Sequence, residues 1–209
     1  MLLPRACPAC GRAGEAPCPP CRGELRPAPS LPPPAAVDRC AALLDYSGVG
    51  REVVARLKYR NARSSLRFLA AGMAALVDPT GVDVVTWAPT TAARRRQRGF
   101  DQSELLARAV ARRLRRPCRR LLRRRPGPAQ TGQSLADRRR GPRFEARGSP
   151  ATAAPRVLLV DDVVTTGATV TAAARTLRAA GAAAVQVVAA ARTSPRGIHS
   201  GMARVRVCG

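Results

Sequence analysis

Two adjacent carboxylates, Asp161 and Asp162, stand between an apolar run and a loop of small, hydroxylated residues. The apolar run at 157–160 predicts a buried strand, which is a rigid base for functional groups. The loop at 165–169 opens an Ala-rich segment typical of a helix. Backbone N–H groups at the start of such a helix bind phosphate, and carboxylates bind sugar hydroxyls. The stretch therefore predicts a pocket for a sugar phosphate.

The residues of this first pocket are Asp161, Asp162, Thr165, Thr166, Gly167, Ala168 and Thr169. An ordinary strand–turn–helix is the alternative, in which both carboxylates are solvated caps. We favour the ligand site because a motif carries more weight when strand and helix flank it as its chemistry requires.

The same thirteen positions, 157–169, resemble the signature that binds 5-phosphoribosyl diphosphate (PRPP) in type I phosphoribosyltransferases. That signature has four hydrophobic residues, two acids, further hydrophobic residues and then Thr-Thr-Gly-x-Thr. The resemblance implies PRPP as the ligand, with Mg²⁺ bound alongside it. It also implies a transfer reaction in which pyrophosphate leaves the ribose.

A ligand with a pyrophosphate group needs a second anion-binding segment. A buried strand predicted at 82–87 ends at Ala88-Pro89-Thr90, and we predict an arginine loop over 94–100 after it. Ligands of α/β sheets bind at the carboxyl ends of strands. Arginine forks match phosphate oxygens, and fixed cations stabilise a leaving pyrophosphate. The candidates here are Pro89, Thr90, Arg94, Arg95 and Arg98, and the predicted catalytic groups are Asp161, Asp162 and Arg98. A solvated charge run is the alternative.

Four cysteines form two Cys-x-x-Cys pairs near the start of the chain: Cys7, Cys10, Cys18 and Cys21. Two such pairs supply four thiolates, which is the ligand set of a structural zinc. Free thiols or disulfides are the alternatives. Three further cysteines, Cys40, Cys118 and Cys208, lack this spacing, and we interpret them as packing or incidental residues.

Basic residues greatly outnumber acidic ones: 37 Lys and Arg against 13 Asp and Glu give a net charge of +24. This excess predicts polyanionic partners, with nucleic acid as one option and a solvated face plus a charged ligand as the other.

No apolar run is long enough to span a membrane and no signal peptide is evident, so we expect a cytoplasmic protein. A single lysine and no G-x-G-x-x-G exclude a Walker ATPase and a dinucleotide fold. His199 is the only histidine and lies in the predicted tail, which argues against a hydrolase triad.

Strand and helix patterns alternate, which predicts an α/β fold with a parallel sheet flanked by helices. Strands are predicted at 41–46, 82–87, 119–124, 157–160 and 185–190, and helices at 49–59, 64–77, 103–114 and 168–180. Residues 127–154 are predicted to form a loop with a short helix near Leu135. The predicted units are a zinc ribbon at 1–26, a proline-rich linker at 27–36, a phosphoribosyltransferase-like domain at 37–192 and a tail at 193–209.

Over nearly its whole length the chain resembles the ComF family of phosphoribosyltransferase-like proteins. The resemblance rests on the double Cys-x-x-Cys, Leu57-Lys58-Tyr59, the block from Pro89 to Gln102, the residues Thr131 to Phe144 and the 157–169 signature. It implies a role in DNA uptake during natural transformation, with single-stranded DNA and a helicase-like motor as partners. Two departures are Asp101, where the family usually has Asn, and the absence of an Asn after Arg138-Arg139-Arg140.

Two functions remain open from the sequence. The chain is either a phosphoribosyltransferase with an unidentified acceptor, or a non-enzymatic DNA-binding accessory protein that keeps the phosphoribosyl pocket only for ligand binding.

Overall fold

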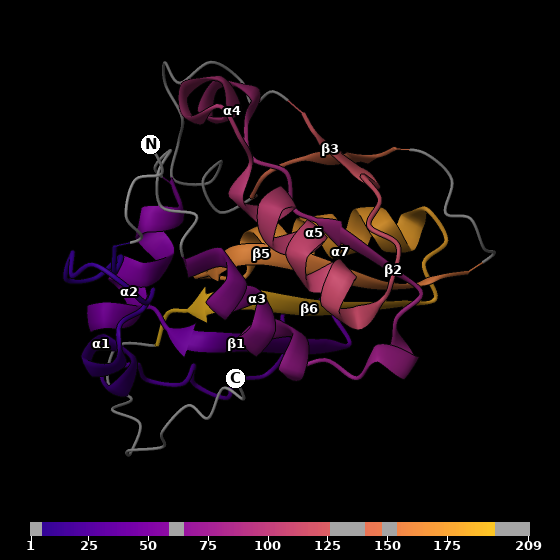
Figure 1. The fold of residues 1–209 in the computed structure, drawn as a ribbon. Helices are drawn as coiled ribbons and strands as arrows, with labels where there is room; N and C mark the ends of the chain where they lie inside the picture. Colours follow the sequence, from indigo (N-terminus) through magenta and orange to yellow (C-terminus); the bar gives the residue numbers. More distant parts are fainter. Residues whose placement is uncertain (1–5, 59–64, 126–140, 148–153, 195–209) are drawn as a thin grey trace.

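Four parallel strands form the central sheet, in the order β1–β6–β5–β2 (Figure 1). The computed structural model describes residues 6–58, 65–125, 141–147 and 154–194. The four strands are β1 (Arg39–Asp45), β2 (Val84–Trp87), β5 (Arg156–Val164) and β6 (Ala184–Arg192). The two central strands, β5 and β6, are buried along most of their length, as expected of parallel strands covered on both faces.

Alternate residues of the central strands contribute to two separate cores. Leu158 and Val160 belong to the core that contains helices α2 (Gly48–Ala55), α3 (Leu66–Ala75) and α5 (Gln102–Leu114). Val157 and Leu159 belong to the core on the opposite face, beneath α7 (Ala168–Ala179). This is the α/β fold with a parallel sheet flanked by helices that the sequence predicts.

The remaining elements are short. An antiparallel pair, β3 (Leu122–Arg124) and β4 (Phe144–Ala146), lies on the α7 side of the molecule. Single turns occur at α1 (Pro19–Gly23), η1 (Arg56–Lys58) and η3 (Pro79–Gly81), and the helix α4 (Ala92–Arg98) precedes α5.

The predicted arginine loop at 94–100 is wrong, because α4 occupies most of it. The Thr91 hydroxyl accepts a hydrogen bond from Arg94 N–H at 3.2 Å, which caps the helix start. Gly99 ends the helix with a left-handed φ of 78°. A capping Thr, seven Ala, Arg and Gln residues in a row and a terminal Gly were together a helix signal.

Two further sequence predictions are corrected. The strand predicted at 119–124 is shorter, since β3 begins only at Leu122. Residues 144–146, predicted to lie in a loop, form β4. The predicted helix near Leu135 and the residues His199 and Cys208 lie outside the described residues.

The proline-rich segment 27–36 packs against the sheet. Pro27 bridges to Leu44, and Ala28 N–H donates to the Leu43 carbonyl at 3.2 Å. The buried Arg192 at the end of β6 donates to the carbonyls of Leu31 and Pro32. The segment is therefore fixed along β1 and at the end of β6.

Candidate functional site

The carboxyl-terminal edge of the sheet brings the two predicted halves of the site together. Ala88, the first residue after β2, donates its N–H to the Val160 carbonyl on β5 at 3.1 Å. Pro89 and Thr90 therefore leave β2 directly beside the position where β5 reaches Asp161. Both Ala88 and Pro89 are buried, and Thr90 is half-buried.

Asp161 lies inside β5, although the sequence placed it after the strand; β5 continues to Val164. Only 6% of Asp161 is exposed, so it is not a solvated cap. Its Oδ1 accepts hydrogen bonds from Ser103 Oγ at 3.1 Å and from Asp162 N–H at 2.9 Å. Burial raises the pKa of Asp161 well above its usual value, and the adjacent Asp162 charge adds to this, against the effect of the two hydrogen bonds.

A second buried carboxylate, Asp101, joins the turn after β2 to the start of α5. Its Oδ2 accepts the Thr90 N–H at 2.8 Å, and its Oδ1 accepts Ser103 N–H at 3.1 Å and Glu104 N–H at 3.4 Å. Burial raises the pKa of Asp101, and the backbone N–H donors oppose that effect. Both carboxylate oxygens are used, which an Asn amide cannot do because its nitrogen accepts no hydrogen bond. An Asp at position 101 can therefore accept from the Thr90 turn and from the start of α5 at the same time.

The loop 165–169 connects β5 to α7. Thr165 and Thr166 are exposed, whereas Ala168 and Thr169 are half-buried in the first turn of α7. Gly167 has a φ of 78°, and a Cβ there would lie 2.9 Å from Pro34 Cγ, so a side chain is excluded both by conformation and by space. The N–H groups of the first turn of α7 lie next to this loop, which is the arrangement required for binding a phosphate.

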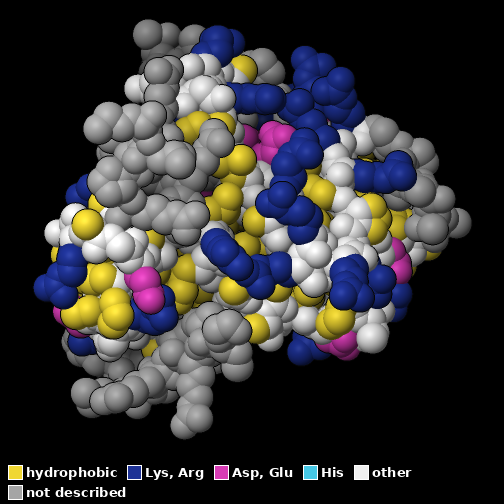
Figure 2. All heavy atoms as spheres, in the orientation of Figure 1, with side chains coloured by type: hydrophobic (Ala, Val, Ile, Leu, Met, Phe, Trp, Pro, Cys, Tyr) yellow, Lys and Arg dark blue, Asp and Glu magenta, His cyan; other side chains and the backbone are white. Residues whose placement is uncertain are grey.

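The predicted arginines Arg94, Arg95 and Arg98 all lie on α4, directly after the Thr90 turn. Arg94 and Arg95 are exposed and Arg98 is half-buried. Figure 2 shows dark-blue basic side chains gathered around a magenta acidic patch in the region between α4 and β3. Basic and acidic side chains thus lie side by side in this region of the surface.

Sequence reasoning did not select Ser103 or Arg124 as residues of this region. It also did not predict that Asp101 would join the Thr90 turn to α5. Ser103 follows the helix-capping Asp101 by two positions, and a polar residue on the apolar side of α5 was the available signal. Arg124, at the end of β3, is half-buried and was hidden in a long arginine run.

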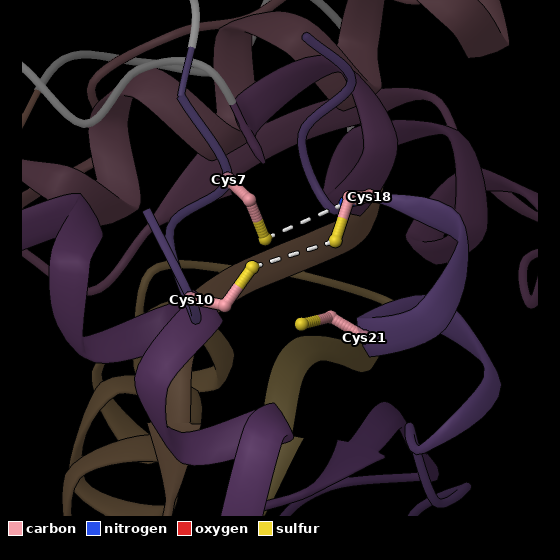
Figure 3. A group of neighbouring side chains, drawn as sticks. All are labelled: Cys7, Cys10, Cys18 and Cys21. Carbon is pink, nitrogen blue, oxygen red and sulfur yellow. Dashed lines mark hydrogen bonds between the residues drawn. The ribbon is translucent and has the colours of Figure 1, made fainter. Parts of the chain in front are cut away.

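The four N-terminal cysteines converge as predicted (Figure 3). The four sulfur atoms lie within 4.8 Å of one another, and the Sγ atoms of Cys10 and Cys18 are 3.6 Å apart. Thiolates on a tetrahedral zinc lie about 3.8 Å apart, given Zn–S bonds of about 2.3 Å. The geometry of this four-cysteine cluster therefore fits a metal ion held by four sulfur ligands.

Local hydrogen bonds prepare one of these thiols for metal binding. Burial raises the pKa of Cys7, but backbone N–H donors, including Cys18 N–H at 3.5 Å, outweigh it and lower the pKa to about 6. Burial raises the pKa of Cys21. A cation would compensate the cost of ionising such a buried thiol.

The other described cysteines lie outside the cluster. Cys40 in β1 and Cys118 before β3 are half-buried, and burial raises the pKa of both thiols, in the case of Cys118 to about 11. Thiols of this kind are unreactive, which agrees with a packing role. Within the described residues, no helix combines the length and the apolar character needed to cross a bilayer.

Solved structures with phosphoribosyltransferase names are among those similar to the chain. A glutamine PRPP amidotransferase from B. subtilis shares 23% identity over 66% of this chain and 30% of its own, with a TM-score of 0.44. A purine phosphoribosyltransferase from Pyrococcus horikoshii shares 15% identity over 61% and 82%, with a TM-score of 0.40. An orotate phosphoribosyltransferase from Aeropyrum pernix shares 22% identity over 58% and 55%, with a TM-score of 0.34.

The chain spans 30% of the length of the amidotransferase that it matches. No curated protein sequence matches with significant similarity. The phosphoribosyl transferase domain family matches residues 101–202, slightly less than half of the 209 residues. The matched segment begins at Asp101 and contains α5, β3, β4, β5 and α7, and hence Asp161 and the 165–169 loop. Residues 101–202 are thus similar in sequence to the phosphoribosyl transferase domain.

Proposed function

We propose that the protein binds PRPP at the carboxyl-terminal edge of the sheet and is a phosphoribosyltransferase. The observation that carries this proposal is the match of 101–202 to the phosphoribosyl transferase domain, with Asp161 brought beside the Thr90 turn. A buried carboxylate, a helix start and exposed arginines at one edge suit the three chemical parts of PRPP, which are ribose, 5′-phosphate and pyrophosphate.

Each part of the ligand has its proposed residues. Asp161 and Asp162 bind the ribose hydroxyls, and residues 165–169 bind the 5′-phosphate through backbone N–H groups and hydroxyls. The pyrophosphate binds along Pro89, Thr90, Arg94 and Arg95. Arg98 stabilises the charge that develops when the bond between ribose C1′ and pyrophosphate breaks. The acceptor that then bonds to C1′ stays unassigned.

We further propose that Mg²⁺ accompanies the ligand. Carboxylate and phosphate oxygens are the ligands that Mg²⁺ prefers, and Asp161 and Asp162 supply carboxylates at this edge. When bound, the ion neutralises charge on the pyrophosphate. The protein residues orient the ribose and the phosphates around it.

Titration calorimetry with PRPP and MgCl₂ tests the proposal. The wild type is expected to bind PRPP, and the double variant Asp161→Asn, Asp162→Asn to lose at least about tenfold in affinity, because each lost charge-assisted hydrogen bond is worth about 1.5–3 kcal/mol. Asp78→Asn, an exposed carboxylate at η3, is the matched control and should bind as the wild type does. Absence of PRPP binding by folded wild type would refute the function. An acceptor screen that detects released pyrophosphate then tests the transfer reaction.

For the four-cysteine cluster we propose a structural zinc, carried by residues 1–26 and joined by 27–36 to the domain at 37–192. A cytoplasmic location, where thiols stay reduced, suits this assignment. Metal analysis of protein purified without chelators is expected to find one zinc per chain. Substoichiometric zinc with fully reduced cysteines would contradict it.

We also propose a ComF-type role in DNA uptake, in which the basic surface contacts single-stranded DNA. The net charge of +24 and the basic side chains in Figure 2 favour a polyanionic partner. DNA affinity should then fall steeply with added salt, because phosphate contacts release counterions. Full DNA binding by the Asp161→Asn, Asp162→Asn variant would indicate two separate surfaces. A salt-independent affinity, or unchanged transformation after gene deletion, would argue against this role.

A further inference from the structure

The end of β6 places a buried arginine next to the start of the 165–169 loop. Arg192 pairs in register with Val164, the last residue of β5, and Thr193 N–H donates to the Val164 carbonyl at 3.1 Å. The residue after Val164 is Thr165, where the loop begins. The backbone of Arg192 is therefore one strand away from the point at which β5 continues into the proposed phosphate loop.

Arg192 is a cation without a carboxylate partner among the described residues. Only 8% of it is exposed, and it is the only basic residue in the described part of the chain that is buried. None of the ion pairs formed there includes it. Its two Nη atoms donate to the carbonyls of Leu31 and Pro32 at 3.4 and 3.3 Å, and its buried Nε has no hydrogen-bond partner. Since buried charges are normally paired, this cation is retained at a cost in stability.

The segment that carries these two carbonyls, residues 31–34, continues to the loop. Pro34 packs against Gly167, because a Cβ at Gly167 would lie 2.9 Å from Pro34 Cγ and 3.1 Å from Pro34 Cβ. Val37 N–H donates to the Pro34 carbonyl at 3.1 Å, and Val37 is buried in the core beneath α7. The 31–34 segment is thus a wall of the loop, held by Arg192 at one end and by Val37 at the other.

The wall and the buried charge both favour a phosphate group at the loop. Gly167 lies directly before α7, whose first N–H groups have no partner within the helix and can donate to a phosphate. A glycine has wide conformational freedom, and the packing of Pro34 restricts Gly167 before a ligand arrives, which lowers the entropic cost of binding. Because the Arg192 charge is shielded from water, it attracts an anion more strongly than a solvated arginine does.

We propose that Arg192 is a positioning residue for the 5′-phosphate of the ligand, acting through residues 31–34 and Gly167; this rests on the proposed PRPP site. The ligand class that gains from it is a phosphate monoester with two negative charges. The free-energy cost of burying an unpaired cation in the ligand-free protein is offset when that dianion binds to the loop. An exposed arginine would also attract the phosphate, but it would not hold the wall against Gly167.

Calorimetry in MgCl₂ with two probes, ribose 5-phosphate and inorganic pyrophosphate, tests the proposal. Arg192→Gln removes the charge and should weaken ribose 5-phosphate binding at least about fivefold, while pyrophosphate binding stays within about twofold of wild type. Arg175→Gln removes the same charge from an exposed position on α7 and should leave both affinities within about twofold. Unchanged ribose 5-phosphate binding by Arg192→Gln would overturn the inference, as would equal losses for the two probes or in the two variants.

A second pair of variants separates positioning from folding. Arg192→Lys keeps the charge and should bind ribose 5-phosphate more tightly than Arg192→Gln does; equal affinities would overturn the role of the charge. Pro34→Ala removes the ring from Gly167, and it tests the wall even where Arg192→Gln fails to fold. It should weaken ribose 5-phosphate binding in the wild type and have little further effect in Arg192→Gln, because both act through residues 31–34. Additive losses would overturn the positioning role. Wild type that binds neither PRPP nor either probe would instead refute the proposed function itself.

Discussion

Asp161 is a carboxylate in surroundings that oppose its charge. It is almost fully buried in β5 and lies next to Asp162, and its pKa is raised for both reasons. Nearby hydrogen bonds from Ser103 and Asp162 N–H orient it but do not restore ordinary acidity. Such a group destabilises the fold when ionised, and binding residues are often retained at this cost.

Asp161→Asn is therefore expected to stabilise the ligand-free protein at pH 7. Above about pH 4 the unfolded state releases the Asp161 proton, whereas the native state keeps it because its pKa is raised. The free energy of unfolding therefore falls as the pH rises from about 4 through the raised pKa. The Asn amide oxygen still accepts both hydrogen bonds and carries no charge. Thermal melting in EDTA should show a gain of about 2–4 °C at pH 7, with little difference at pH 4. Asp78→Asn, at an exposed position, should give no gain; a lower Tm for Asp161→Asn at pH 7 would contradict this account.

Asp101→Asn is expected to destabilise the protein by about 1–2 kcal/mol. The amide nitrogen would face the Thr90 N–H, so that one buried donor loses its acceptor. Urea unfolding measures the change. Glu104→Gln, three residues further into α5 and only half-buried, is the control and should cost less than about 0.5 kcal/mol. An unchanged midpoint for Asp101→Asn would show that the Thr90 contact contributes little.

At this scale the sequence predicts Asp161, Asp162 and the 165–169 loop as site residues because a contiguous motif carries its own spacing. Ser103 and Arg124 could not be found in the same way. Ser103 is separated from Asp161 by 58 positions, and only the packing of α5 against β5 joins them. Arg124 stands in a run of arginines that differ in burial but not in residue type.

At the scale of elements, close packing of α3 against β1 depends on Gly72. A Cβ at Gly72 would lie 2.5 Å from one Leu43 methyl carbon and 2.7 Å from the other. Leu43 is itself buried in the core that α3 shares with the sheet, so its side chain has little room to move.

Gly72→Ala should therefore destabilise the protein by about 1–3 kcal/mol, although alanine is the better helix former. Gly23→Ala in α1 is the matched control, because nothing lies within 4 Å of a Cβ there. That variant should unfold within about 0.5 kcal/mol of wild type. Equal midpoints in urea for the two variants would show that Leu43 adjusts freely.

The elements with strong periodicity were predicted almost to their ends, since α5 and α7 differ from expectation by a single residue. The α4 helix was missed because charge was given more weight than its capping Thr91 and terminal Gly99. The three-residue β4 has no periodic signal, and its pairing with β3 across a long separation defines it. Local pattern thus predicts long elements, while tertiary pairing decides the short ones.

For the whole molecule, the four-cysteine cluster is joined to the main core. Cys7, Cys18 and Cys21 pack with Val49 at the start of α2, and Arg22 lies over the Phe68 ring of α3 at 5.6 Å. Loss of a bound metal should therefore lower the stability of the sheet as well as that of the cysteine turns.

Cys18→Ser is expected to lower the Tm of the entire protein by at least about 5 °C, as should a strong chelator on the wild type. Cys118→Ser, at a half-buried thiol outside the cluster, serves as the control and should change Tm by less than half as much. A separate low-temperature transition that leaves the sheet signal unchanged would show that the cluster melts independently.

Both outer strands of the sheet are shielded by segments of the same chain. Residues 26–28 lie along β1, with Asp45 N–H donating to the Arg26 carbonyl at 2.9 Å, and Cys118 and Arg119 pair along β2. Open strand edges are templates for intermolecular pairing and fibre growth, and proline, which has no N–H, makes a poor template. By covering the β1 edge, the proline-rich segment thus hinders pairing of β1 with a strand of another molecule. Trimming the chain to its α/β unit would expose the β1 edge, and we expect the trimmed protein to aggregate more readily.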